Sequence, residues 1–181
     1  LDRRKPRSPS NRPHRLAGRS FALLSDGEKA RLQMLQETAK LKLLHLQQTN
    51  QRLFAQAWPQ EEMANKMLDI DFAERVDAFV ARFGRLQDLL GDKYLPAWLR
   101  AVQEPEGTAL ENLDRAEKLG LVQSADAWIS VRKLRNQLVH EYVGRMDILH
   151  DALFQANDQV SLLAFMADQL VERTSRLIES E

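Results

Sequence analysis

Residues suited to phosphate chemistry gather in one segment of the chain, residues 128–143. Arg132, Arg135, Asn136 and His140 all lie within it. An imidazole titrates near neutral pH and can therefore move protons, and a guanidinium offers two parallel donors to the oxygens of a phosphate group. A phosphate that lies in a groove against this segment could therefore meet both kinds of side chain.

A helical wheel at about 100° per residue predicts how these side chains are arranged. Arg135 falls inside the apolar arc of the helix, where an unpaired charge would cost several kcal/mol. Arg132, Asn136 and His140 recur every four residues along one edge of the same arc. Arg135 and His140 diverge by about 140°, so we expect them to line the two sides of a groove rather than share one face.

A purely structural role would also explain these residues. Arg135 could form an ion pair with an acidic residue on another helix. His140 could lie near a helix C-terminus, where the helix dipole favours a positive charge. For an arbitrary arginine and histidine on a helix, this is the more common arrangement.

The elements that must position the segment all carry helix signals. Residues 25–28, 71–74 and 108–111 each match a capping box, in which a side chain accepts a hydrogen bond from a free backbone amide and a glutamate reaches back. The helices that begin there are expected to end at Pro59, Gly91 and Gly120, the last with a Schellman-type turn.

Two further helices are expected from about residue 124 to 142 and from about 147 to 178, whereas residues 92–106 resemble a connector with at most a short helical turn. Sustained alternation and hairpin turns, the signals of strands, are not found. The sequence therefore predicts an all-α fold: an antiparallel bundle of about five helices with a four-helix up-down core.

Composition agrees with one helical domain. The chain has 181 residues, of which 44% are hydrophobic, with only seven glycines and six prolines. The net charge is zero, but residues 1–19 hold seven basic side chains and one acidic one, so 19 basic and 25 acidic residues remain over 20–181. We expect residues 1–24 to form a basic arm, either a disordered tail or a contact to nucleic acid, and residues 25–181 to form the bundle.

Several classes of protein are disfavoured. Without cysteine, the chain cannot form a disulfide, a thiolate metal site or a cysteine nucleophile. No stretch approaches the ~18 apolar residues that cross a bilayer, so a soluble, cytoplasmic protein without membrane contact is expected. Acidic pairs such as Glu61 and Glu62 fit a solvated connector better than a metal site, and neither a metal nor a cofactor is predicted.

Residues 135–142, Arg-Asn-Gln-Leu-Val-His-Glu-Tyr, resemble the R-N-x-x-x-H-x-Y signature of the HEPN superfamily, in particular HepT-like toxins that pair with MNT-type nucleotidyltransferase antitoxins. Residues 112–122, followed by Ala127 and Trp128, resemble the helix and turn that lead into this motif in that family. The resemblance covers roughly residues 26–178 and is sharpest over 108–144.

The resemblance implies a metal-independent endoribonuclease that acts as a homodimer, with two motif helices meeting at a shared cleft. Arg135 and His140 match the catalytic pair, and Asn136 matches the polar residue that follows the arginine. Together with Arg132 of the same helical row, Asn136 would support phosphate binding. Tyr142 matches the tyrosine that partner nucleotidyltransferases AMPylate to silence the toxin. A dimer would also supply the second histidine that acid–base cleavage of RNA can use.

Two alternatives remain open at the level of sequence. The chain could be a non-catalytic HEPN module that serves as the partner or substrate-binding subunit of a nucleotidyltransferase. The row of polar residues could also be a structural network at a dimer interface. Residues 1–19 and 60–70 have no obvious counterpart in short family members, and the acidic body is unfavourable for RNA unless positive charge concentrates at the site.

Overall fold

The computed structural model describes residues 24–105, 107–140 and 145–180. Within these ranges every regular element is a helix, which confirms the all-α prediction. The elements are α1 (Asp26–Leu53), a 3-10 turn η1 (Gln60–Glu62), α2 (Met63–Lys66), α3 (Ile70–Asp88), a π-helical segment η2 (Leu89–Tyr94), α4 (Leu95–Ala101), α5 (Ala109–Lys118), α6 (Ala125–His140) and α7 (Met146–Glu179).

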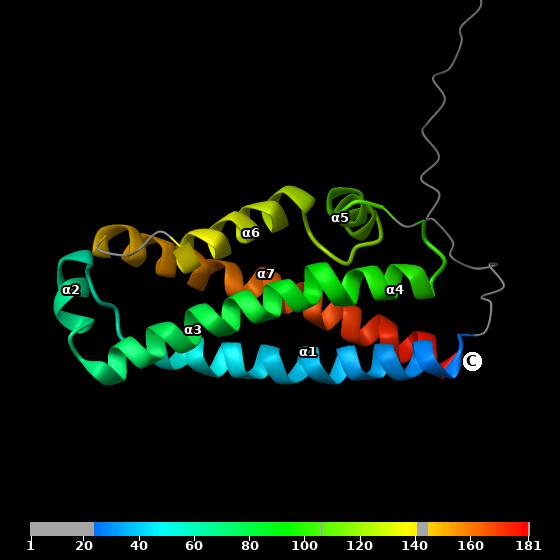
Figure 1. The fold of residues 1–181 in the computed structure, drawn as a ribbon, viewed down its shortest axis with the longest axis horizontal. Helices are drawn as coiled ribbons and strands as arrows, with labels where there is room; N and C mark the ends of the chain where they lie inside the picture. Colours follow the sequence, from blue (N-terminus) through cyan, green and yellow to red (C-terminus); the bar gives the residue numbers. More distant parts are fainter. Residues whose placement is uncertain (1–23, 106, 141–144, 181) are drawn as a thin grey trace, which may run out of the picture.

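The long helices α1, α3, α6 and α7 form an antiparallel up-down bundle (Figure 1). α1 packs against α3 and α7, and α6 packs against α7 and α3. Burial of their apolar faces stabilises the arrangement, at roughly 25 cal/mol per Å² of apolar surface removed from water. Side chains with no exposed surface come from all four helices and include Leu46, Phe79, Leu138 and Leu170.

Helix ends follow local signals at two of the three predicted capping boxes. At α1, Ser25 and Glu28 form the reciprocal capping bonds, and at α5, Thr108 and Glu111 do the same. Gly120 ends α5 with a φ of 72°, a conformation that suits a residue without a side chain.

The hydrogen bonds after α5 complete the predicted Schellman motif. The Leu121 amide donates to the Ala116 carbonyl at 2.8 Å, and the Gly120 amide donates to the Glu117 carbonyl at 2.9 Å. This turn fixes the direction in which the chain enters α6.

The predicted start and end of the second helix were wrong. The N-cap of α3 is Asp69, whose carboxylate accepts from the Asp71 amide at 3.0 Å, so Asp71 is already helical. Gly91 does not end the helix, because the chain continues through η2 into α4 up to Ala101. The predicted connector over 92–106 is therefore largely helical.

Tertiary packing explains why the helix continues past Gly91, and one proline explains the wide turn within it. Apolar side chains of η2 and α4, including Leu90, Leu95 and Leu99, are buried in the core and outweigh the glycine. Pro96 lacks an amide proton for the helical ladder, and the chain forms a wide turn just before it, in which the Leu95 amide donates to the Leu90 carbonyl.

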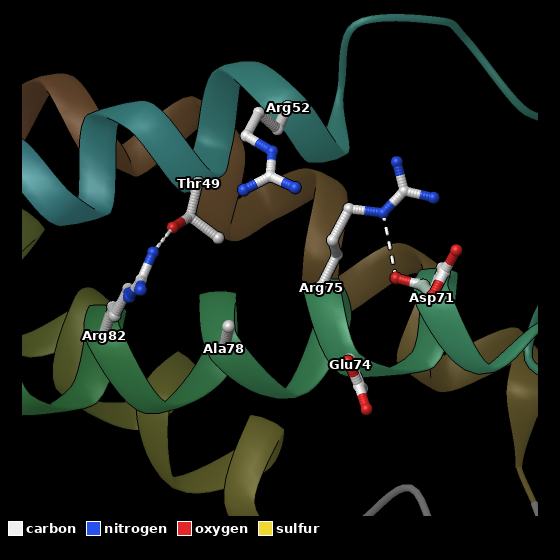
Figure 2. Close-up of a pocket in the computed structure, with 7 residues that line it drawn as sticks. All are labelled: Thr49, Arg52, Asp71, Glu74, Arg75, Ala78 and Arg82. Carbon is white, nitrogen blue, oxygen red and sulfur yellow. Dashed lines mark hydrogen bonds between the residues drawn. The ribbon is translucent and has the colours of Figure 1, made fainter.

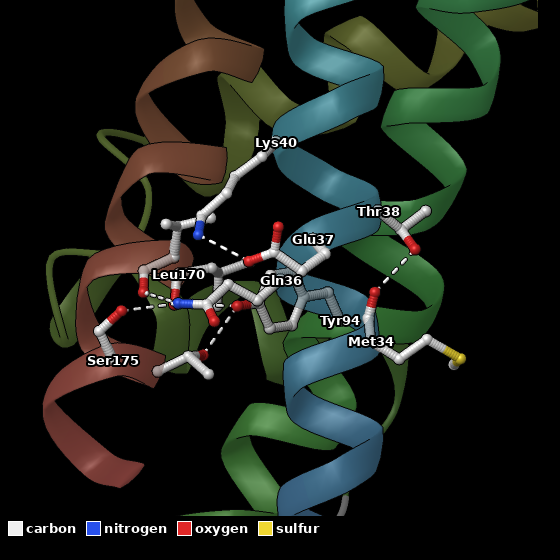
Figure 3. A network of polar contacts seen from close by, with 10 residues as sticks. Met34, Gln36, Glu37, Thr38, Lys40, Tyr94, Leu170 and Ser175 are labelled. Atoms are coloured by element: carbon white, nitrogen blue, oxygen red, sulfur yellow. Dashed lines mark hydrogen bonds and ion pairs between the residues drawn. The ribbon is translucent and has the colours of Figure 1, made fainter. Parts of the chain in front are cut away.

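A polar network ties this helical segment to its neighbours (Figure 3). The Tyr94 hydroxyl, on a side chain with no exposed surface, donates to Thr174 Oγ1 at 2.8 Å and lies 3.2 Å from the Leu170 carbonyl. Gln36 Nε2 of α1 donates to Ser175 Oγ of α7 at 2.7 Å. Burial raises the pKa of Tyr94 to about 12. The network therefore anchors η2 to α7 and α1 to α7.

Two further sequence expectations concern the basic arm and membrane crossing. Residues 1–23 of the predicted basic arm lie outside the described residues, and the next residue, Leu24, is buried. Across the part of the chain that the structure describes, no helix combines the length and apolar character that a membrane crossing needs.

Candidate functional site

Helix α6 is fixed at its start and along its inner face. The Ala127 amide donates to Ser124 Oγ at 3.2 Å, which satisfies a free donor of the first turn. Trp128, Val131 and Leu138 are buried between α6 and the rest of the bundle. The side chains on the neighbouring arc of α6 therefore face α3 and η2.

A hollow of about 430 Å³ lies where α6 meets the end of α3 and the second half of η2. We call it the α6 hollow. It contains three of the predicted site residues, Arg132, Arg135 and Asn136, brought together as the helical wheel suggested. The residues that line it are Gln87, Asp88, Asp92, Lys93, Arg132, Arg135 and Asn136.

Arg135 is held from two sides in the α6 hollow. Its Nη2 lies 2.7 Å from Asp88 Oδ2 on α3, and its Nη1 donates to Asn136 Oδ1 at 3.0 Å. The pairing of Arg135 with an acidic residue of another helix, one of the two arrangements expected from the sequence, is therefore present. The side chain keeps 29% of its surface exposed, so the guanidinium remains accessible.

The side chain of Arg135 packs against α3 at Gly84. A Cβ at position 84 would lie 3.4 Å from Arg135 Nε and 3.5 Å from its Cγ. The Nε group is buried and has no hydrogen-bond partner among the described residues. The arginine stem thus lies against α3 at a distance where a Cβ at position 84 would make ordinary van der Waals contact with it.

Arg132 forms the second ion pair of the hollow. Its Nη1 lies 3.4 Å from Asp92 Oδ1, with both side chains close to half exposed. Ion pairs at this degree of exposure contribute about 0–1 kcal/mol. A more highly charged anion could therefore compete with the carboxylates for the two arginines.

Gln87 is the most unusual residue lining the hollow. Its side chain is only 1% exposed, yet neither amide atom has a hydrogen-bond partner within the described part of the chain. A buried polar group without a partner costs about 1–3 kcal/mol, so it is a natural contact for a water or a ligand group in the hollow.

Sequence reasoning missed the residues that α3 and η2 contribute. Asp88, Asp92 and Lys93 were assigned to the helix end or the connector, because Gly91 has the character of a helix stop. The spacing of Asp88 and Asp92 was a usable signal, because residues four apart lie on one face of a helix. Arg132 and Arg135, three residues apart, also share one face, so the two acidic residues could be paired with the two arginines.

The structure describes the remaining predicted site residues only in part. The backbone of His140 forms the last residue of α6, and its side chain lies outside the description. Tyr142 also lies outside the described residues. In the described ranges, no group of three histidine or acidic side chains is arranged to hold a metal ion.

No protein-family model, curated protein or solved structure matches this chain. The resemblance to HEPN proteins therefore stays a prediction from residues 135–142 of the sequence.

Proposed function

We propose that the chain is a HEPN-type, metal-independent endoribonuclease that uses Arg135 and His140 in a cleft completed by a second subunit. In this proposal it is the cytoplasmic toxin of a toxin–antitoxin pair, and an MNT-type nucleotidyltransferase is the antitoxin. The observation that carries the proposal is the clustering of Arg132, Arg135 and Asn136 of α6 around one hollow.

Arg135 is suited to stabilise the negative charge that develops when a phosphodiester is attacked. A guanidinium has five N–H donors, and the bonds to Asp88 and Asn136 use one N–H of each terminal nitrogen. The second N–H of each terminal nitrogen can bind phosphate oxygens without a change in the position of the side chain, whereas the Nε–H is buried against α3. Donors that are fixed before the reaction are worth most in the transition state.

His140 would carry the proton transfers. It lies five residues after Arg135, about 7.5 Å further along the axis of the same helix. In a homodimer with α6 facing α6, two histidines would be available: one to activate the 2′-hydroxyl and one to protonate the leaving oxygen. Tyr142, two residues beyond, would be the AMPylation target of the antitoxin.

An RNA cleavage assay in EDTA tests this proposal. We expect His140→Ala to slow cleavage by about 10²–10⁴-fold, because the variant loses the proton-transfer group. His45→Ala is the matched control, since His45 is an exposed histidine of α1 remote from the motif. Undiminished cleavage by His140→Ala would contradict the proposal.

A second function is favoured by one specific observation. Asp88 and Asp92 pair with Arg135 and Arg132, so the hollow already contains negative charge that opposes RNA binding. A non-catalytic module that presents Tyr142 to a nucleotidyltransferase would tolerate this pairing. That function predicts a stable complex with the nucleotidyltransferase and Tyr142 modification, with no RNA cleavage by the unmodified chain.

A further inference from the structure

A second hollow, of about 420 Å³, lies on the other side of α3, against the end of α1. We call it the arginine hollow (Figure 2). Arg52 extends from α1 into the space between Arg75 and Arg82 of α3, while Glu74 points away from that space. The lining residues are Thr49, Arg52, Asp71, Glu74, Arg75, Ala78 and Arg82.

The arginines of this hollow that form hydrogen bonds donate to neutral oxygens. Arg82 Nη1 donates to the Thr49 hydroxyl and, at 3.3 Å, to the His45 carbonyl. Arg75 Nε donates to the backbone carbonyl of Asp71 at 3.0 Å. Among the described residues, none of the three arginines forms an ion pair with a carboxylate, although two acidic side chains line the same space.

The charge of the hollow suits an anion. Three guanidinium groups and two carboxylates line it, which leaves a net positive charge, and the carboxylate of Glu74 points away from the space. A backbone phosphodiester carries one negative charge, and its two non-bridging oxygens match the planar fork of arginine. A guanidinium that is already oriented by a neutral contact, as in Arg75 and Arg82, loses little freedom on binding.

Helix α3 connects the two hollows. α1 packs on one side of α3 and α6 on another (Figure 1). Arg82 of the arginine hollow and Asp88 of the α6 hollow are six residues apart, about 9 Å along the axis. Between them, Arg85 is exposed on α3. A chain of evenly spaced single charges could therefore contact both hollows at once, which an isolated anion could not do.

We propose that the arginine hollow binds a backbone phosphodiester of single-stranded RNA and holds the strand that enters the α6 hollow. This inference rests on the proposed function, because it takes RNA to be the polyanion. It assigns the hollow a role in holding substrate, separate from the proposed cleavage chemistry.

A binding assay that does not depend on cleavage tests the inference. The probe is a fluorescent 2′-O-methyl oligoribonucleotide, which lacks the hydroxyl that cleavage requires. We expect the full chain with Arg52→Gln and Arg75→Gln together to bind about tenfold more weakly. The slope of log K against log salt should become shallower by about 0.7 for each phosphate that the variant no longer neutralises.

The variants are chosen to leave the fold intact. Arg82 is not changed, because its hydrogen bond with Thr49 joins α1 to α3. Arg31→Gln with Lys118→Gln is the matched control: it removes the same charge from exposed positions on α1 and α5 that line neither hollow. Circular dichroism and urea unfolding of each variant exclude unfolding as the cause of weaker binding.

Three results would overturn the inference. The first is equal weakening by the control variant, which would show a general effect of net charge. The second is inorganic phosphate shifting the NMR signals of the Arg52 and Arg75 side chains while the double variant binds RNA normally, which would identify a site for free phosphate. The third is arginine-dependent binding of an acidic peptide by a chain that does not bind the RNA probe, which would identify a protein partner.

The same experiments separate this inference from the proposed nuclease. If the double variant binds RNA weakly and His140→Ala still cleaves RNA, the nuclease mechanism fails and the phosphate site stands. If the double variant binds normally and His140→Ala abolishes cleavage, the arginine hollow has no part in holding RNA and the nuclease stands.

Discussion

The α6 hollow and the arginine hollow are close in volume, at about 430 and 420 Å³, and each is lined by three basic and two acidic side chains. They differ in what their arginines contact. Arg132 and Arg135 pair with carboxylates of the neighbouring helical segment, whereas Arg75 and Arg82 donate to neutral oxygens. The first arrangement fixes a guanidinium in place, and the second keeps its charge available to a ligand.

This difference fits a division between chemistry and binding. A residue that stabilises a transition state must be positioned before the reaction, and an ion pair such as Arg135–Asp88 provides that. A residue that holds the substrate acts through accessible charge and needs less exact placement. The two hollows should therefore respond differently to the same kind of substitution.

The largest expected difference comes from removing one arginine in each hollow. Arg135→Gln should lower kcat for RNA cleavage by about 10²–10³-fold, because it removes a fixed donor to the transition state. Arg75→Gln should raise KM more than it lowers kcat, because it removes uniform binding. Steady-state kinetics on one short RNA gives both values, and equal effects on kcat and KM in the two variants would remove the distinction.

An intermediate effect is expected from Tyr94, which anchors η2 behind the α6 hollow. Tyr94→Phe removes the bonds to Thr174 and Leu170 and should lower the free energy of unfolding by about 1–2 kcal/mol in urea titrations. Because the folded pKa is raised to about 12, the contribution of the phenol is fully present below about pH 10 and is lost as the pH rises toward 12.

The phenylalanine variant serves as the control for that pH dependence. Wild-type stability should fall more steeply than that of Tyr94→Phe between pH 10 and 12. Binding to the arginine hollow should be unchanged, because none of the residues that line it belongs to η2. Parallel pH curves for the two proteins would show that Tyr94 is not the titrating anchor.

The smallest expected effect comes from Asp88→Asn, which makes the α6 hollow resemble the arginine hollow. The free energy of unfolding should change by less than about 1 kcal/mol, because the Arg135–Asp88 pair is partly exposed. RNA binding should tighten about two- to threefold at low salt as one negative charge is removed. Asp77→Asn, an exposed acid of α3 outside both hollows, is the control, and equal tightening there would indicate a general charge effect.

Local signals in the sequence predicted the fold well. The capping boxes at Ser25 and Thr108 and the turn at Gly120 depend on bonds within a few residues, so their patterns are visible in the sequence. Gly91 misled the prediction because its usual tendency to end helices is outweighed by burial of the apolar side chains around it, which no local window contains.

The sequence predicted only the residues that α6 contributes to the candidate site. Arg132, Arg135 and Asn136 could be grouped from the period of a single helix. Their partners Asp88 and Asp92 lie about forty residues or more away in sequence, and the pairing depends on how α6 packs against α3. The arginine hollow was missed for the same reason, because its arginines come from different helices and none belongs to a motif.

The wide turn of η2 also changes the rotational phase of the helical rod that α3, η2 and α4 form. Each residue of an α-helix advances by about 100°, so the extra residue taken up by the turn offsets the face of α4 from that of α3 by about that angle. Asp88, upstream, faces the α6 hollow, while Trp98, downstream, stays in the core. Both ends of the rod therefore keep apolar side chains in the core, while Asp88, just before the turn, lies at the wall of the α6 hollow.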